Sequence, residues 1–211
     1  MDVIYEDNHL LIVNKPAGLL TQPAGEVQDS LETQAKAWIK DKYLKKGDVF
    51  LGVVHRLDKP VSGIVVFAKT SKALSRLNES LRSKEVQKTY YALVEGRPPR
   101  QEGILEHYLR HDDYRAYVCD KKDPRGKLAR LHYHVREGSL LEIILETGRY
   151  HQIRCQCSAS GFPIVGDIKY GGHVTPHFSS NQIALHHGRV TIKHPVTQAL
   201  LTFESSPSFS L

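Results

Sequence analysis

Short apolar segments recur along nearly the whole chain, and their number and spacing restrict the fold more than any other feature of the sequence. Nine of them have the length and the aliphatic or aromatic content that is typical of β-strands. They are residues 3–5, 10–14, 50–55, 64–68, 90–95, 104–109, 128–135, 140–146 and 183–192. Because many of these segments follow one another with no helix between them, they predict a largely antiparallel sheet. The sequence therefore predicts a strand-rich fold of the α+β class.

Three other segments have the pattern of α-helices. Asp or Ser at 29–30 can cap a helix whose apolar residues share one face, and Thr or Ser at 70–71 can cap a second one. The third segment, 151–160, is followed by a glycine and then a proline, which commonly end a helix. No repeat, low-complexity tract or linker divides the chain, so we expect a single domain spanning residues 1–211.

The composition is that of an ordinary globular protein of 211 residues. Its longest apolar runs are far below the roughly 18 consecutive residues of a membrane-spanning helix, so we expect no membrane partner. The segment before the first lysine has no basic region, unlike a signal or transit peptide. We therefore expect a cytoplasmic location and, with three cysteines at no framework spacing, reduced thiols.

The positive charge of the chain is concentrated in one segment. Lys and Arg number 29 against 23 Asp and Glu, which gives a formal net charge of +6. Residues 56–130 hold 17 of the basic and 10 of the acidic side chains, so they account for the whole excess. A concentrated positive field suits a polyanion such as nucleic acid, although the same charge can serve solubility alone.

The segment GVVHRLDKPVSGIVVFAKT, residues 52–70, carries the most chemical information. An apolar strand leads into His55, Arg56 and Asp58, and a second apolar strand follows. Asp58 is therefore expected in a loop between two buried strands, where reactive groups are commonly carried. The alternative is that its side chain only closes a turn. The complete motifs of protein kinases, P-loop proteins and zinc deaminases are absent, so nucleotide hydrolysis and deamination lose support.

The segment TGRYHQIRCQCSASGFPIVGD, residues 147–167, brings basic and aromatic side chains to the start of the third predicted helix. There, Arg154 is expected one turn from His151, with Arg149 and Tyr150 at the entry. Such a cluster can bind a phosphate or pair with a buried carboxylate, or it can be a solvated polar face. Cysteines two apart on a helix point in different directions, so we expect no metal site there.

A third segment, VQKTYYALVEG, residues 86–96, places Lys88 and Tyr90 before an apolar stretch. Tyr90 is either a core or cross-strand aromatic residue or a ring that stacks on a base. The segment alone does not distinguish the two.

In order and spacing, these segments resemble the pseudouridine synthases of the RluA type, the branch that acts on large-subunit ribosomal and transfer RNA. The resemblance covers almost the whole chain, from IYEDNHLLIVNKPAGLLTQP through HRLDKPVSG, QKTYYALVEG and TGRYHQIR to LHHGRVTIKHPVTQALLTFE. HRLDKPVSG and TGRYHQIR are each specific, whereas KTYYALVEG is weak alone. The resemblance implies the pseudouridine-synthase fold, with a mixed, mainly antiparallel central sheet flanked by helices and loops and an active-site cleft across the sheet.

The resemblance also implies an isomerase that breaks the glycosidic bond of a uridine in RNA, turns the base and rejoins it through carbon 5. Asp58 would be the essential group, attacking the sugar, attacking the base or removing a sugar proton. Tyr90 would stack against the extruded uracil, and Arg154 would pair with Asp58 and hold it ionised. Arg56 would fill the gap left by the flipped nucleotide or contact its phosphate. The remaining candidate RNA contacts are His55, Lys88, Arg149, His151 and Gln152.

No metal or organic cofactor is implied, because the isomerisation involves no redox change and no net hydrolysis. RNA is the expected partner of a monomeric protein, with ribosomal RNA slightly favoured over transfer RNA. Many relatives carry a small RNA-binding domain before the IYEDNHLLIVNKP stretch, which here lies close to residue 1. We therefore expect the catalytic domain itself to hold RNA through the basic segment 56–130. Within it, residues 121–130 form either a basic RNA-contacting loop or a solvated hairpin tip.

Two other classes of function stay open. A catalytically silent RNA-binding or chaperone protein could keep the same fold, although it would not need Asp58, Tyr90 and Arg154 together. A glycosylase could use the same aspartate on a flipped base. Release of free uracil would distinguish a glycosylase from an isomerase.

Overall fold

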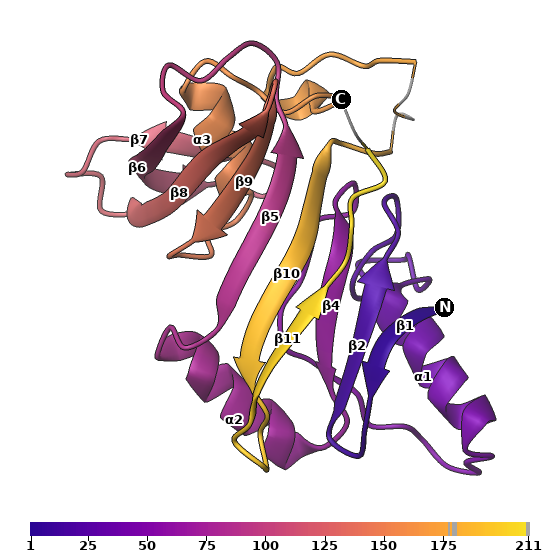
Figure 1. The fold of residues 1–211 in the computed structure, drawn as a ribbon. Coiled ribbons are helices and arrows are strands. Elements are labelled where there is room, and N and C mark those ends of the chain that lie inside the picture. The colour runs from indigo at the N-terminus through magenta and orange to yellow at the C-terminus, as the bar shows by residue number, and fades with distance from the viewer. Residues whose placement is uncertain (177, 179–180, 210–211) are drawn as a thin grey trace. The chain divides into compact units, whose positions relative to one another are not determined.

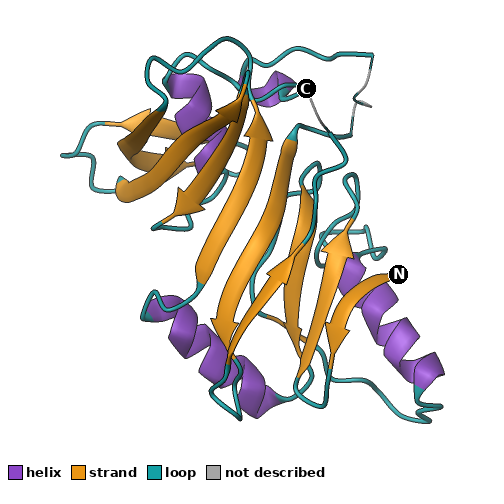
Figure 2. Cartoon of the chain, viewed as in Figure 1, coloured by secondary structure: helices purple, strands orange, loops and turns teal. Residues whose placement is uncertain are grey.

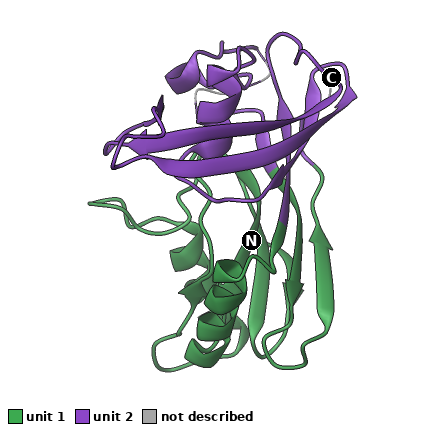
Figure 3. Ribbon diagram, turned by 90° about the vertical axis from the view of Figure 1, so that its left-hand side faces the viewer, with its two compact units in different colours: residues 1–87, 187–206 green, residues 88–186, 207–211 purple. Residues whose placement is uncertain are grey.

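The computed structural model describes residues 1–176, 178 and 181–209. The chain forms two compact units, coloured separately in Figure 3. The first unit comprises residues 1–87 and 187–206, and the second comprises residues 88–186 and 207–211. Strands outnumber helices in the described part of both units (Figure 2). The predicted α+β class is confirmed.

In the first unit, the strand order is β1-β2-β4-β10, with β3 paired to β4 and β11 paired to β10 (Figure 1). The elements are β1 (Asp2–Glu6), β2 (Leu10–Lys15), α1 (Leu31–Lys42), β3 (Gly52–Val53), β4 (Ser62–Ala68), α2 (Ser71–Arg82), β10 (Leu185–Lys193) and β11 (Leu200–Glu204). The pairs β1–β2, β2–β4, β3–β4 and β10–β11 are antiparallel. Residues 187–193 of β10 belong to this unit.

Strands β2 and β4 form the centre of this unit and are buried on both faces. Residues 10–13 and 64–68 are at most 1% exposed, which is why their sequences are continuous apolar runs rather than alternating patterns. One face packs against Ala73 and Leu77 of α2. Helix α1 buries Leu31, Ala35 and Ile39.

Side-chain caps begin the first two helices at residues that the sequence marks. The hydroxyl of Ser30 accepts from the backbone N–H of Thr33, and that of Thr70 accepts from the N–H of Ala73. Each bond satisfies a backbone donor that has no partner inside its helix. Of the alternatives at 29–30 and 70–71, Ser30 and Thr70 are therefore the caps.

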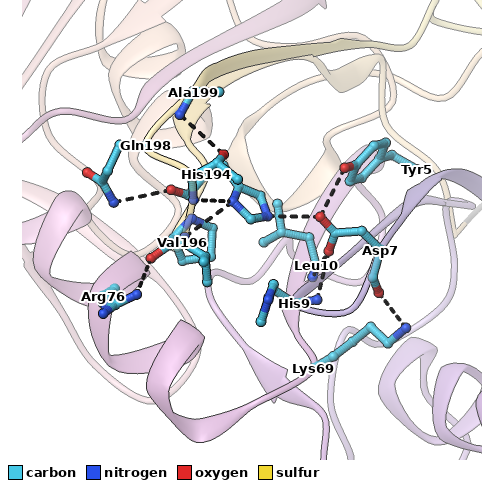
Figure 4. A network of polar contacts seen from close by, with 12 residues as sticks. Tyr5, Asp7, His9, Leu10, Lys69, Arg76, His194, Val196, Gln198 and Ala199 are labelled. Carbon is cyan, nitrogen blue, oxygen red and sulfur yellow. Dashed lines mark hydrogen bonds and ion pairs between the residues drawn. The ribbon is translucent and has the colours of Figure 1, made fainter.

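A buried polar network joins the β1–β2 turn to the turn between β10 and β11 (Figure 4). His194 Nδ1 accepts from the backbone N–H groups of Val196 and Thr197, so Nε2 carries the proton that His194 donates to Asp7, at 2.8 Å. The Asp7 carboxylate also accepts from Tyr5 and from two backbone N–H groups of its own turn. These bonds satisfy a partly buried carboxylate and hold its pKa below the usual value.

In the second unit, the strand order is β5-β9-β8-β6-β7. The elements are β5 (Gln87–Leu93), β6 (Glu102–His111), β7 (Ala116–Cys119), β8 (Lys127–Glu137), β9 (Leu140–Leu145), α3 (Gln152–Ala159) and a 3₁₀ turn (Ile168–Tyr170). These neighbouring strands pair in the antiparallel sense. Helix α3 lies against β6 and β7, and the core beneath it includes Leu109, Ala116, Ala129, Cys155 and Tyr170.

The structure departs from the predicted elements mainly at sheet edges. Strand β3 has two residues instead of the predicted six, and β7 and β11 were not predicted. In β7, Tyr117 and Val118 are both exposed, so the segment lacks the alternation that identifies a half-buried strand. Residues 120–126 link β7 to β8, which lie on opposite sides of β6. The segment 121–130 is therefore not a hairpin tip, because β7 and β8 do not pair. The bounds of the loop reading are wrong as well, since residues 127–130 lie in β8, and RNA contact by residues 121–126 stays a prediction.

Cys119, Cys155 and Cys157 form no disulfide, and their reduced state stays a prediction. Cys155 and Cys157 are buried in α3. Burial raises the pKa of Cys155 to about 11 and that of Cys157 to about 12. Both act as small apolar packing residues.

Gly63 sits where β4 approaches β10 too closely for a side chain. Its φ is +115°, and a Cβ there would lie 2.4 Å from the carbonyl oxygen of His187. We expect Gly63→Ala to destabilise the protein by more than about 1 kcal/mol, because alanine is strained at this φ and the obstacle is backbone. Gly47→Ala is the control, since its Cβ would meet nothing within 4 Å. Denaturant unfolding measures both variants, and equal midpoints would contradict the prediction.

Candidate active site

Asp58 lies in the loop between β3 and β4, and two neighbouring segments hold that loop. The Thr21 hydroxyl donates to the carbonyl of Leu57, at 2.8 Å, and accepts from the N–H of Leu57. The N–H of Gly18 donates to the carbonyl of Lys59, at 2.8 Å. The backbone is thus fixed on both sides of Asp58. The turn itself is closed by the backbone, because the carbonyl of Asp58 accepts from the N–H of Val61.

Lys15, at the end of β2, provides a third attachment to this loop. Its side chain is fully buried, and Nζ lies 2.9 Å from the carbonyl of Pro16, 2.7 Å from that of Leu19 and 3.2 Å from that of Lys59. Burial lowers the pKa of Lys15 to about 7, while the negative charge of Asp58 acts in the opposite direction. Lys15 is therefore electrostatically coupled to the candidate catalytic carboxylate.

The other predicted residues of the HRLD segment have different surroundings. His55 is half-buried, and its Nε2 accepts from the backbone N–H of Val66 in β4. Its ring meets that of His187 edge-on at 5.2 Å. Arg56 is exposed. His55 thus makes a hydrogen bond to the backbone of β4, beside the short strand β3. The side chain of Arg56 is exposed to solvent.

In the second unit, Lys88 and Tyr90 lie on β5. Tyr90 is 7% exposed and is paired in register with Ile143 of β9. Lys88 is half-buried, and burial lowers its pKa. Tyr90 is therefore a cross-strand aromatic residue, and the base-stacking role stays a prediction.

The segment before α3 is held by Gln152. The Oε1 atom of Gln152 accepts from the hydroxyl of Thr147 and the N–H of Arg149, and its Nε2 donates to the carbonyl of Arg130. The side chain could contact RNA directly only by giving up some of these bonds. His151, at the helix start, has a left-handed backbone with φ of 49° and is 9% exposed. Its Nδ1 lies 2.9 Å from the hydroxyl of Tyr170.

Arg154 forms a buried, two-point ion pair within the second unit. Its Nε donates to Asp167 Oδ2 at 2.7 Å and its Nη2 to Oδ1 at 2.8 Å. The guanidinium also lies over the ring of Tyr170, 5.0 Å from its centre. Asp167 was not singled out from the sequence, although it ends the segment 147–167. The pairing of Arg154 with Asp58, which belongs to the other unit, stays a prediction.

No described helix is long and apolar enough to cross a membrane. Among the residues that the structure covers, no group of three or more His, Cys, Asp and Glu side chains could hold a metal ion.

Comparisons with known proteins agree on one family. A family profile described as RNA pseudouridylate synthase matches residues 9–159. Uncharacterized RNA pseudouridine synthase YhcT of Bacillus subtilis is 35% identical over 213 residues, which cover 97% of this chain and 68% of that protein. Ribosomal large subunit pseudouridine synthase D of Escherichia coli is 34% identical over 213 residues, covering 93% of this chain and 64% of that protein.

The fold is likewise that of a solved relative. The structure of human RNA Pseudouridylate Synthase Domain Containing 4 matches with a TM-score of 0.80 at 22% identity. The match covers 98% of this chain and 88% of the human one.

Because the Arg154–Asp167 ion pair is buried, we expect the removal of one partner to lower the free energy of unfolding strongly. Asp167→Ala leaves a buried guanidinium without its carboxylate, which costs about 3–5 kcal/mol of unfolding free energy. Glu106→Ala is a matched control in the same unit, because Glu106 and Arg130 form a half-exposed pair at 3.6 Å whose loss costs less than about 1 kcal/mol. Chemical denaturation compares the two. Similar losses would show that the buried pair is not a structural anchor.

The lowered pKa of Lys15 predicts a pH dependence of stability. The folded protein releases this proton at a pKa of about 7, whereas the unfolded chain keeps it up to about 10.5. Between these values the unfolded state binds more protons, so the free energy of unfolding rises with pH in this window. In Lys15→Met this contribution is gone. Urea unfolding from pH 6.5 to pH 9.5 should therefore show the wild type gaining stability relative to the variant, and parallel curves would refute the assignment.

Proposed function

Because the chain belongs to the RNA pseudouridine synthase family, we propose that it isomerises a specific uridine in structured RNA with Asp58 as its essential reactive group. RNA pseudouridine synthases are isomerases, and this chain belongs to that family. The observation that carries the assignment is the position of Asp58. Hydrogen bonds from Thr21, Gly18 and Lys15 fix the backbone at Leu57 and Lys59, on either side of Asp58. A catalytic group needs neighbours that hold it in position in this way.

The reaction requires the uracil to leave the base stack. The enzyme spends a few kcal/mol to extrude the nucleotide and recovers this energy in a pocket. We assign Tyr90 to stacking against the extruded uracil, and Arg154 to holding Asp58 ionised. Arg56, which is exposed on the Asp58 loop, would fill the vacated position or contact the phosphate. This scheme requires the two units to act as one catalytic domain spanning residues 1–211.

The first step can follow three routes. The Asp58 carboxylate can attack the sugar at carbon 1′, attack the base, or remove a sugar proton to form a glycal. In each route the bond from carbon 1′ to nitrogen 1 breaks and a bond from carbon 1′ to carbon 5 forms. The proton on carbon 5 is then lost to a base, and nitrogen 1 takes up a proton, so the product is an isomer of the substrate. No redox change occurs, so the scheme includes no cofactor.

The substrate is proposed to be ribosomal RNA, with transfer RNA as the second choice. The preference rests on relatives named as ribosomal large subunit pseudouridine synthases, which include those of Escherichia coli and Zymomonas mobilis. A cytoplasmic location and a monomeric state agree with this substrate and stay predictions.

The test uses Asp58→Asn, which keeps the shape of the side chain and removes its charge. On ribosomal RNA transcripts labelled with tritium at carbon 5 of uridine, the wild type should release tritium to water and form pseudouridine. Asp58→Asn should lower this rate by at least about 1,000-fold, because no carboxylate remains, while the Kd for the RNA changes less than about threefold. Asp48→Asn, at an exposed loop position of the same unit, is the control and should retain the wild-type rate.

Each competing function gives a different result. Free uracil released by the wild type would identify a glycosylase. RNA binding without any change in the uridine, on both ribosomal and transfer RNA, would identify a silent binding protein. Full activity in Asp58→Asn would overturn the site assignment.

A further inference from the structure

A basic pocket lies within the second unit, beside the turn that leads into α3. It is formed by the end of β6, the starts of β7 and β8, and residues 148–150, in the part of Figure 1 where these elements gather. Its volume is about 440 Å³, within the roughly 300–1,000 Å³ that is usual for ligand sites. None of the functions assigned above uses this pocket as a whole.

The pocket carries an unbalanced positive charge. Four cationic side chains line it, namely Arg110, Arg125, Lys127 and Arg149, and in the described structure no carboxylate does. The nearest acidic partner of Arg110 is Asp123, at 3.7 Å. The other three cations make no ion pair with any residue that the structure describes. Cations that line one pocket repel one another, and an anion bound there relieves this repulsion.

Arg149 is oriented before any ligand arrives. Its Nε donates to the carbonyl of Leu128 at 2.9 Å, which fixes the plane of the guanidinium at the pocket. Its backbone N–H donates to the buried Gln152 amide. Less side-chain entropy is therefore lost when a phosphate is bound.

An aromatic wall completes the pocket. The ring of Tyr150 stacks on that of His151 with 3.9 Å between centroids and 18° between planes, and it also meets His111 at 5.2 Å. His151 is anchored by the hydroxyl of Tyr170, which in turn accepts from the N–H of Ala116 in β7. Tyr150 nevertheless remains 41% exposed. A rigid, partly exposed ring beside several cations is the combination that binds single-stranded nucleic acid.

We propose that this pocket binds one unpaired nucleotide of the RNA substrate other than the target uridine, with its phosphate between the cations and its base against Tyr150. The proposal rests on the proposed function for the identity of the polyanion. An acidic peptide would use the cations equally but would gain little from the ring, so the two kinds of ligand respond differently to changes at Tyr150.

The experiment compares two double variants with the same loss of charge. Arg125→Gln/Lys127→Gln removes two pocket cations, whereas Lys45→Gln/Lys46→Gln removes two exposed cations of the loop after α1, outside the basic segment 56–130. The probe is an unmodified large-subunit ribosomal RNA transcript, and its Kd is measured across a salt series. We expect the pocket variant to raise the Kd about tenfold and to lower the salt slope by less than about 1, since the one phosphate contact that is weakened contributes about 0.7–0.9. The loop variant should change the Kd less than about threefold.

Tyr150 is tested separately with Tyr150→Leu and Tyr150→Phe. Loss of the ring in Tyr150→Leu should raise the Kd about tenfold with no change in the salt slope, and Tyr150→Phe should stay close to the wild type. Thermal melting confirms that each variant is folded. Equal effects of the pocket and loop pairs would overturn the proposal. An effect of the cations without any effect of Tyr150→Leu would also overturn it, because the pocket would then hold RNA phosphate with no base against the ring.

Failure of the proposed function is recognised independently. If the wild type makes no pseudouridine but the pocket variants still weaken RNA binding, the proposal of an RNA-binding pocket is supported and the proposed isomerase activity is wrong. If the wild type makes pseudouridine and the pocket variants bind and react as the loop variant does, the pocket proposal alone falls.

Discussion

A single buried lysine amine joins the backbone segments that frame Asp58. Lys15 comes from a strand whose preceding residues are fully buried, and its Nζ donates to carbonyls on both segments, at 16–19 and at 59. A polar group removed from water in this way must have its hydrogen bonds satisfied inside the protein. The segments therefore have to close around it, and Asp58 acquires a fixed backbone as a result. The geometry of the loop is a consequence of satisfying Lys15.

Much of the fold can be predicted from the sequence where burial is strong. The continuous apolar runs of β2 and β4 can be recognised because strands covered on both faces tolerate few polar residues, and the caps at Ser30 and Thr70 follow from a local hydrogen bond. The prediction is incomplete where a short strand is exposed and therefore has no apolar alternation. Strand β7 pairs with the strand before it, with Leu109 opposite Val118, but Tyr117 and Val118 are both exposed, so nothing in its own four residues marks it as a strand.

The candidate site divides in a similar way. The motifs find Asp58 and Arg154, because charged residues between buried segments are conspicuous. They do not show that Arg154 is already engaged by Asp167, or that the amide of Gln152 holds the turn before α3. These partners are separated in sequence from the features they support, so only folding brings them together. Lys15 did carry a signal, since a lysine that closely follows the apolar run 10–13 is expected to be buried and must then find acceptors in the protein.

The burial of the cysteines in α3 has a practical consequence for chemistry on this protein. A thiol reacts with maleimides, iodoacetamide or peroxide only as its thiolate, and burial holds the pKa values of Cys155 and Cys157 far above the pH of ordinary buffers. Cys119 is partly exposed, but its pKa is also raised, first by desolvation. The native thiols are thus poorly reactive, and a cysteine introduced at the protein surface would take up a spectroscopic label or a cross-linker selectively. The packing that makes these residues useful to the core also leaves the surface open to site-directed probes.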